Sequence, residues 1–565
     1  MLQNLYTSQG ENIPDIPWNV YPRPQLRRDS FFNLNGYWDF TCSHSRNLPL
    51  NYPGVILVPF CPESLLSGLN THFPEGEFLY YRRTFTLPEG FHKGRVLLHI
   101  GAADQELQCY VNNKFVGSHI GGYESMTFDI TEQLRTENTL TIRCTDDLRK
   151  HTLPYGKQSL SRGGMWYTPV SGIWQTVWLE SVPEKHIHKL NIENRGTSVT
   201  ISVMPFLNGT VTVNGLGSFP LTAGKAVITP EKPHLWSPED PYLYDFTVET
   251  ETDRVQSYFA LRTLDIQEVN GFPRLCLNGK PYFFHGLLDQ GYFSDGIYTP
   301  AAPECYTQDI QTAKKLGFNT LRKHIKVEPE QFYYDCDRLG MIVFQDMVNN
   351  GDYSYFRDTV LPTIGLQKLA DKTMHRNADT RQAFLNGMKA TVEQLRNHPC
   401  IVYWTIFNEG WGQFAADEAY DTLQELDGTR FIDTTSGWFR QKKTDVESLH
   451  VYFGSWKGLK SGKKPLVLSE FGGYTYYVNG HVLNPKNSYG YKTCHTPGEL
   501  QQEMEVLYRS KILPAIGKGL CAAIYTQLSD VEDEINGLVT YDRKITKVDE
   551  QAMQTLAKDL QSAIK

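Results

Sequence analysis

The stretches HPCIVYWTIFNEGWG (His398–Gly412) and KPLVLSEFGG (Lys464–Gly473) decide the fold. Each contains a short, almost continuously apolar run, and the runs end at Glu409 and Glu470. Runs of this kind are typical of parallel strands that are buried on both faces. We therefore expect a parallel sheet covered by helices, with one glutamate at the C-terminal end of each of these two strands.

Working outward, short apolar runs alternate with helical patterns over about 280 residues, which is the size of a (β/α)8 TIM barrel. The predicted strands are Tyr282–Leu288, Asn319–His324, Met341–Asp346, Ile401–Phe407, Phe431–Thr434, Leu449–Tyr452, Pro465–Glu470 and Cys521–Thr526. Helices are predicted at Thr307–Leu316, Pro329–Leu339 and Asp417–Leu426, and a fourth helix is expected to be capped by Asp379 or Thr380.

The chain before this region favours β structure. Up to about residue 180, short runs such as Arg95–Ile100 and Glu106–Val111 lie between turn signals, which is the pattern of a β-sandwich. The following segment repeats this pattern, has the length of an immunoglobulin-like domain, and contains many prolines. We predict two β-sandwiches, at residues 1–180 and 181–266, followed by a catalytic barrel at residues 267–565.

Composition excludes several functional classes. The chain has 565 residues, a net charge of -8 and a pI near 6.1, so no basic surface for nucleic acid is expected. No apolar run is long enough to predict a membrane span. The N-terminal residues lack the basic and apolar regions of a signal peptide. A cytoplasmic location is expected, or a periplasmic one with a signal peptide removed by processing. Ten scattered cysteines without a CxxC pair indicate reduced, mostly buried thiols.

Two glutamates at strand ends of an α/β barrel are expected to converge, because the C-terminal strand ends surround the active site. A glycosidase needs one carboxyl group to protonate the leaving oxygen and a second to attack the sugar or activate water. In retaining enzymes these groups lie about 5 to 5.5 Å apart. Either glutamate alone is equally compatible with a strand cap or an ion pair, but Glu409 and Glu470 together predict a glycosidase.

Other polar and aromatic residues fall at predicted strand ends. Arg322 and His324 share one face of the second strand and are candidate donors to sugar hydroxyls, with a structural ion pair as the alternative for Arg322. Tyr452 is expected to donate a hydrogen bond that keeps Glu470 ionised. The acidic candidates for hydroxyl contacts are Asp289 and Asp346. The aromatic candidates for stacking on the sugar, with core packing as the alternative, are Trp411, Trp438 and Tyr525.

These motifs resemble glycoside hydrolase family 2, which includes β-galactosidases, β-glucuronidases and β-mannosidases. The resemblance covers nearly the whole chain and includes PRPQLRRDSFFNLNGYWDF (Pro22–Phe40), YRRTFTLP (Tyr81–Pro88), GGMWYTPVSGIWQTVWLE (Gly163–Glu180), HLWSPEDPYLY (His234–Tyr244) and GFNTLRKHI (Gly317–Ile325). It implies a jelly-roll first domain. It also implies that Glu409 is the acid/base, Glu470 the nucleophile, Asn408 a contact of the sugar 2-hydroxyl and Arg322 a site residue.

Departures from the family pattern bear on the substrate. The Asn-x-Lys pair of β-glucuronidases has no counterpart at Glu534-Ile535-Asn536, and QDMVNNGD (Gln345–Asp352) lacks the Glu and His of magnesium-dependent β-galactosidases. The residue pattern around Arg322 and His324 also differs from that of the family. We therefore expect no cofactor, no essential metal and a neutral sugar of the galactose type.

The sequence thus predicts a retaining exo-acting hydrolase of terminal β-glycosides, most consistent with a β-galactosidase. A β-glucuronidase, β-mannosidase or arabinosidase of the same family stays open as an alternative. A carbohydrate-binding protein that has lost activity is the alternative from a different class. The expected partner is a glycoside or oligosaccharide, with neither nucleic acid nor membrane, and the resemblance implies that homo-oligomers can form.

Overall fold

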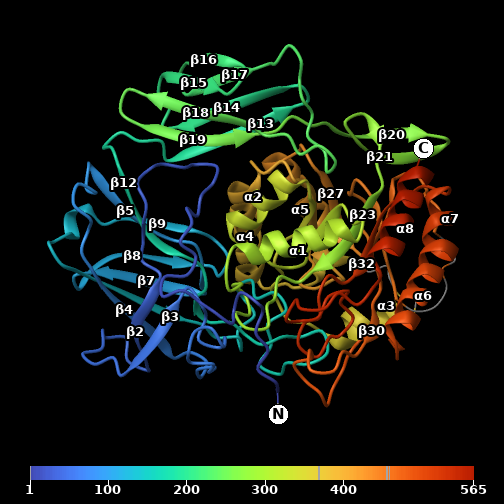
Figure 1. Ribbon diagram of the computed structural model, residues 1–565, viewed down its shortest axis with the longest axis horizontal. Coiled ribbons are helices and arrows are strands. Elements are labelled where there is room, and N and C mark those ends of the chain that lie inside the picture. The colour runs from blue at the N-terminus through green and yellow to red at the C-terminus, as the bar shows by residue number, and fades with distance from the viewer. Residues whose placement is uncertain (1, 365, 367–369, 453–455, 457–458, 565) are drawn as a thin grey trace.

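The computed structural model describes residues 2–364, 366, 370–452, 456 and 459–564. Two β-sandwiches precede a barrel, as predicted, and Figure 1 shows the first sandwich in blue at the left, the second in green at the top and the barrel in yellow to red. The barrel core is continuous with apolar residues of the first sandwich, including Tyr167 and Trp174. Segments far apart in sequence therefore meet beside the barrel.

The first sandwich packs a six-stranded sheet, in the order β3-β2-β4-β10-β7-β8, against a four-stranded sheet in the order β1-β12-β5-β9. Both sheets contribute apolar residues to one core, among them Phe40 and Leu98. The strands are β1 Phe32–Asn33, β2 Gly36–Ser43, β3 Gly54–Val58, β4 Phe78–Phe85, β5 Arg95–Ile100, β7 Glu106–Val111, β8 Lys114–Ile120, β9 Met126–Asp129, β10 Asn138–Thr145 and β12 Val177–Val182. A short pair, β6 Ala103–Asp104 and β11 Gly172–Ile173, lies beside them.

The second sandwich packs the sheet β13-β14-β17 against the sheet β16-β15-β18-β19. Alternate residues of these strands point into one core, which includes Ile201, Val211 and Phe246. The strands are β13 Lys189–Arg195, β14 Ser198–Met204, β15 Gly209–Val213, β16 Gly217–Leu221, β17 Lys225–Ile228, β18 Tyr244–Thr250 and β19 Arg254–Phe259.

A small antiparallel sheet precedes the barrel and was not predicted from the sequence. It comprises β20 Leu264–Val269, β21 Phe272–Leu277 and β22 Lys280–Pro281. Arg274 attaches it to the barrel by donating to the carbonyl oxygens of Leu520 at 3.0 Å and Ile516 at 2.7 Å.

The barrel contains all eight predicted strands, paired in parallel in the order β27-β26-β25-β24-β23-β32-β29-β28. Between the two end strands of this order, the Ser448 hydroxyl donates to Asp433 at 2.9 Å, so the ring is nearly closed. The strands are β23 Phe284–Asp289, β24 Thr320–Lys323, β25 Ile342–Asp346, β26 Ile401–Asn408, β27 Phe431–Ser436, β28 Glu447–Val451, β29 Leu466–Gly472 and β32 Leu520–Thr526.

Helices surround these strands, and their positions follow the predicted periodicity closely. The fourth predicted helix begins differently: Asn377 is the cap, because its side chain accepts hydrogen bonds from the amides of Asp379 and Thr380. The helices are α1 Glu304–Lys315, α2 Glu330–Leu339, α3 Leu361–Thr363, α4 Ala378–Leu395, α5 Ala416–Leu426, α6 Pro497–Leu507, α7 Leu513–Ile516 and α8 Glu550–Ala563.

Two predictions from composition can be compared with the fold. All ten cysteines are free thiols and only Cys42 is not buried, which confirms the predicted pattern. Among the described residues, no helix combines the length and apolarity that crossing a membrane requires.

Candidate active site

The strand ends of the barrel bring the candidate catalytic residues together. Asn408 ends β26 and Glu409 follows it, while Glu470 lies near the end of β29. One carboxylate oxygen of Glu409, one of Glu470 and a ring nitrogen of His450 all lie within 4.8 Å of one another. This closeness matches the short carboxyl separation of a retaining glycosidase rather than the wider separation of an inverting one.

Glu470 is held as a carboxylate by several donors. The Arg322 guanidinium donates to it at 3.0 Å, and the predicted hydrogen bond from the Tyr452 hydroxyl is present. Burial by itself raises the pKa of Glu470, but His450, Arg322 and His324 together with the Tyr452 hydroxyl lower it to about 2. The group is therefore ionised over the ordinary pH range, as a nucleophile must be.

Arg322 connects Glu470 to its neighbours. Its Nε donates to Asp346 at 3.0 Å and its Nη2 donates to the Asn408 Oδ1 at 2.8 Å. Asp346 is 1% exposed, and burial raises its pKa, while Arg322 and His324 bring that pKa below the usual value. Asp346 thus holds Arg322 and His324 in place, and the predicted sugar contact of Asp346 is corrected to a supporting role.

His450 is a site residue that the sequence analysis missed. Its Nδ1 lies 2.7 Å from Glu409 Oε1, and its Nε2 lies 3.0 Å from the Ser436 hydroxyl and 3.6 Å from Glu470 Oε1. It occupies β28 two residues before Tyr452, which was selected as the end of a predicted strand, and the period-2 rule applied to Arg322 and His324 would have placed His450 on the same face as Tyr452. This two-residue spacing from Tyr452 was the sequence signal that could have identified His450.

His324 and Lys157 line the neighbouring wall. His324 Nδ1 lies 2.7 Å from Asp346, and no hydrogen bond from the described residues engages its Nε2. Burial lowers the pKa of His324 to about 4, and the positive charge of Lys157 contributes. At neutral pH the imidazole is therefore uncharged and its Nε2 is available to a sugar hydroxyl.

Lys157 comes from the first sandwich, and nothing in its local sequence marks it. It is 7% exposed, and its ammonium lies 5.4 Å from the ring centre of Tyr167 and 5.9 Å from that of Trp411. Within the described parts of the chain the ammonium has neither a hydrogen bond nor an ion pair. A buried cation without a counter-ion is costly unless a ligand supplies one.

Two predicted sugar contacts lie elsewhere. Asp289 accepts a hydrogen bond from the Lys323 ammonium at 2.6 Å and another from the Gly291 amide at 2.9 Å, so its oxygens are occupied away from the carboxylate pair. Tyr525 is completely buried, and its hydroxyl accepts from the amide of Tyr474 at 3.1 Å. Its ring packs as part of the core and has no face available for stacking.

The predicted tryptophans take different places. Trp438 is partly buried and lies edge-on to His450 with 5.5 Å between ring centres, so it borders the site beside His450. Trp411 is 2% exposed and stacks on Trp166 at 5.3 Å, with the Tyr353 ring against its edge. Trp411 therefore supports Trp166, a residue of the first sandwich, and is itself enclosed.

One cluster among the described residues has the donors that a metal ion would need. Glu409, His450 and Glu470 have oxygen and nitrogen atoms close enough to share an ion. Because these are also the two candidate catalytic carboxylates, a cation bound there would occupy the position of the sugar. The arrangement therefore fits an inhibitory cation better than a resident one.

Curated relatives share part of this chain. A β-galactosidase of Thermoanaerobacter pseudethanolicus is 24% identical over 369 residues, which cover 59% of this chain and 45% of the relative. The β-glucuronidase of Felis catus is 25% identical over 454 residues, covering 69% of this chain and 65% of the relative. The chain spans between about half and two thirds of the length of these curated relatives.

Solved structures of the same fold cover nearly the whole chain. The β-D-glucuronidase of Dictyoglomus thermophilum superposes with a TM-score of 0.72 at 18% identity, covering 95% of this chain and 98% of that one. A family 2 β-galacturonidase from Eisenbergiella tayi superposes with a TM-score of 0.66 at 18% identity, covering 96% and 98%. At these identities the likeness shows that the fold is shared.

The family models match two parts of the chain. The model described as glycosyl hydrolases family 2, TIM barrel domain, matches residues 268–554, and the model described as glycosyl hydrolases family 2 matches residues 187–262. The first match alone covers half of the chain and includes both candidate catalytic glutamates. The chain belongs to glycosyl hydrolases family 2.

Proposed function

We propose that this protein is a retaining, exo-acting glycoside hydrolase that removes terminal β-linked sugars. The observation that carries the proposal is the pair of carboxylates at the barrel mouth, with Glu470 held ionised by Arg322 and Tyr452 and Glu409 within reach of His450. Glu409 keeps 16% of its side chain exposed against 6% for Glu470, so Glu409 faces the open side, where a leaving group departs.

The reaction proceeds in two displacements. The Glu470 carboxylate attacks the anomeric carbon while the Glu409 carboxylic acid protonates the glycosidic oxygen, and the leaving alcohol departs. Glu409, now a carboxylate, removes a proton from water, which attacks the same carbon and displaces Glu470. Asn408 is proposed to hold the sugar 2-hydroxyl, and His324 Nε2 to accept a hydrogen bond from a neighbouring hydroxyl, since Nδ1 of the neutral imidazole donates to Asp346.

The first candidate sugar is a neutral hexose of the galactose type, because Glu534-Ile535-Asn536 offers no lysine for a sugar carboxylate. The second candidate is a uronide. It is favoured by the ammonium of Lys157, which has no ion pair among the described residues and lies near His324 and beside Trp411. A sugar carboxylate would supply the counter-ion that this buried ammonium lacks. Relatives and structural neighbours include β-galactosidases, β-glucuronidases and a β-galacturonidase.

A panel of aryl glycosides tests both the proposed reaction and the proposed sugar. The wild type and Glu470→Gln are assayed on β-galactoside, β-glucuronide, β-galacturonide, β-mannoside and α-L-arabinopyranoside substrates. Hydrolysis of one glycoside that disappears in Glu470→Gln supports the reaction, and hydrolysis that survives in this variant contradicts it. If no substrate is hydrolysed, while a sugar still binds, the inactive carbohydrate-binding alternative holds.

Lys157→Met separates the two sugar classes. A uronidase should lose at least about tenfold in kcat/KM on uronides, because a charged hydrogen bond is removed, and should keep its activity on neutral glycosides. A galactosidase should show no such selective loss.

A further inference from the structure

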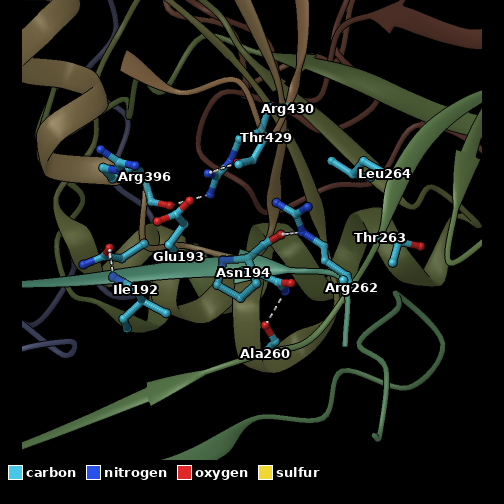
Figure 2. Close-up of a pocket in the computed structure, with 13 residues that line it drawn as sticks. Ile192, Glu193, Asn194, Ala260, Arg262, Thr263, Leu264, Arg396, Thr429 and Arg430 are labelled. Carbon is cyan, nitrogen blue, oxygen red and sulfur yellow. Dashed lines mark hydrogen bonds between the residues drawn. The ribbon is translucent and has the colours of Figure 1, made fainter. Parts of the chain in front are cut away.

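A cavity of about 280 Å³, separate from the candidate active site, lies between the second sandwich and the barrel. Figure 2 shows its wall: β13 and the segment 260–264 contribute one side, and residues 396–399 with Thr429 and Arg430 contribute the other. The barrel residues precede β26 and β27, whereas Glu409 follows β26. The cavity therefore lies at the opposite end of the barrel strands from the candidate catalytic carboxylates.

Three arginines line this cavity, and one of them is fully paired. Arg430 donates to Asp427 at 2.8 Å, to the Thr429 hydroxyl at 2.9 Å and to backbone carbonyl oxygens. Its charge is neutralised by Asp427, whose pKa is lowered by Arg430 against the opposing effect of burial. Arg430 accordingly holds the loop before β27, and its donors are already used.

Arg262 is buried without a carboxylate partner in the described parts of the chain. Its Nε donates to the carbonyl oxygen of Pro399 at 2.6 Å and its Nη2 to that of Ile401 at 2.7 Å, which leaves Nη1 without a hydrogen bond from the described residues. Burial and then the nearby charge of Arg430 lower the pKa of Arg262 to about 9. Asp427 and Asp337 oppose this effect from nearby, but among the described residues neither forms an ion pair with Arg262.

Two more groups on the wall lack partners. In the portion of the chain that is described, the Arg396 side chain has no ion pair or hydrogen bond, although its own carbonyl oxygen accepts from Arg430. The Asn194 amide donates to the Ala260 carbonyl oxygen at 2.8 Å, but its buried Oδ1 has no donor among the described residues. The cavity thus offers unused cationic donors together with an unused neutral acceptor.

The charge balance of the wall is positive. The one acidic residue among the cavity-lining residues is Glu193, and it pairs with Arg195 at 2.7 Å. Because Arg430 pairs with Asp427, the charges of Arg262 and Arg396 remain without an ion pair among the described residues. An anion would be attracted to them, and a hydroxyl group on the same molecule would satisfy the Asn194 oxygen.

We propose that this cavity binds a hydroxylated anion of monosaccharide size, namely a sugar acid or a sugar phosphate. Its anionic group would lie against Arg262 Nη1 and Arg396, and a hydroxyl would donate to Asn194 Oδ1. The volume is near the lower end of small-molecule sites, which suits one sugar unit. Because the wall combines second-sandwich and barrel residues, the bound anion would hold these two domains together. This site does not depend on the reaction at the other end of the barrel.

Isothermal titration with D-glucuronate, glucose 6-phosphate and neutral D-glucose tests the site at low ionic strength. Wild type is compared with Arg396→Gln, which keeps the contacts of Arg262, and with the control Arg135→Gln, which removes an exposed charge of the first sandwich. At least one anion should bind the wild type, and its affinity should fall about tenfold or more in Arg396→Gln but not in the control. Glucose should not bind this site.

The two anions also identify the source of the ligand. A preference for glucose 6-phosphate indicates a sugar phosphate, and binding of glucuronate that responds to Arg396→Gln indicates a sugar acid. Glucuronate held by the catalytic end would not respond to this substitution. Asn194→Ala gives an independent check, since it should weaken the same anion while leaving both arginines intact.

Three results would overturn the proposal. One is the absence of binding for both anions at tens of millimolar, and another is equal weakening by Arg396→Gln and Arg135→Gln, which would indicate general charge attraction. The third is binding of neutral glucose that the Arg396→Gln substitution changes as strongly as it changes the anions. The melting temperature of each variant without ligand shows whether it is folded.

Discussion

At the scale of single residues, the two glutamates differ in what surrounds them. Glu470 is nearly enclosed and receives hydrogen bonds from Arg322 and Tyr452, whereas Glu409 pairs with His450 and stays partly open. These environments separate the functions of two chemically identical side chains. The separation supports the proposal that Glu470 is the nucleophile and Glu409 the acid/base.

Tyr452→Phe should raise the pKa of Glu470, because the variant loses a hydrogen bond that favours the charged form. In the wild type the nucleophile stays ionised down to a pH of about 2. The acidic limb of the kcat/KM profile should therefore move to higher pH in the variant and leave the alkaline limb in place. An unchanged acidic limb would show that this hydroxyl does not control the nucleophile.

Glu409→Gln should slow hydrolysis of glycosides with poor leaving groups by about 10² to 10⁴-fold, which is the usual contribution of a general acid. Aryl glycosides with strongly acidic phenols need less protonation and should lose much less in the first displacement. Values of kcat/KM, which report the first displacement alone, are plotted against leaving-group pKa to measure this difference. Equal losses for all leaving groups would assign the acid to another residue.

His450→Gln should lower kcat by roughly tenfold or more while leaving KM close to the wild-type value, because His450 orients Glu409 and approaches Glu470 without binding the sugar. Ser436→Ala removes the hydroxyl that contacts the imidazole and Ser469, leaves the His450–Glu409 contact in place, and is the matched control, with a smaller expected loss. A loss confined to KM would instead place His450 against the substrate.

Zn²⁺ should inhibit in competition with substrate, and a chelator should leave the basal activity unchanged. The reason is that Glu409, His450 and Glu470 have donors close enough for one cation, and these carboxylates are the ones that the sugar needs. Initial rates at several substrate and Zn²⁺ concentrations measure the mode of inhibition. Activation by Zn²⁺ would point to a resident metal.

At the scale of elements, the turn after β26 depends on a glycine. Gly410 has a φ of +76°, and a Cβ there would lie 2.4 Å from the buried ring of Phe439. Glu409 itself has a φ of +51°, so two successive residues of this turn are left-handed. The turn directs the Glu409 side chain toward His450, which lies near the end of β28.

Gly410→Ala should therefore reduce both activity and the melting temperature. Gly480→Ala is the matched control, since Gly480 has a φ of +82° but no atom within 4 Å of the position that a Cβ would take. Both variants incur the conformational cost of roughly 1 kcal/mol for a left-handed alanine, but only Gly410→Ala adds a steric clash near the site. Similar losses in the two variants would remove the clash from the explanation.

At the scale of the whole molecule, buried histidines connect stability to pH. His285 lies inside the barrel wall, with Nδ1 3.1 Å from the Gly317 carbonyl oxygen and Nε2 3.1 Å from the Tyr508 hydroxyl. Burial lowers its pKa from 6.5 to about 4. As the pH falls, His285 is protonated in the unfolded chain at a higher pH than in the folded protein. The contribution of His285 to stability is therefore complete above pH 6.5 and is lost as the pH falls toward 4.

His285→Gln should remove this pH dependence. The difference in unfolding free energy between wild type and variant should shrink by up to about 3 kcal/mol between pH 7 and pH 4. Urea unfolding of both proteins at several pH values measures it. A constant difference across this range would mean that His285 does not titrate as its burial requires.

Local sequence patterns were sufficient to predict the order of the domains, the eight barrel strands and the two candidate catalytic glutamates. Apolar periodicity and strand-end position are local properties, and they survive folding because every strand end of a parallel barrel reaches the same rim. The predicted Tyr452–Glu470 hydrogen bond follows from the same rule.

Contacts between segments that are far apart in the chain decided which polar groups pair with each other and which reach the candidate active site. Asp289 pairs with Lys323, Tyr525 packs in the core, and Lys157 approaches the barrel mouth from another domain. The positively charged cavity is likewise formed by residues of two domains, the second sandwich and the barrel. These outcomes depend on distances between segments that are far apart in the chain, and no local pattern contains those distances.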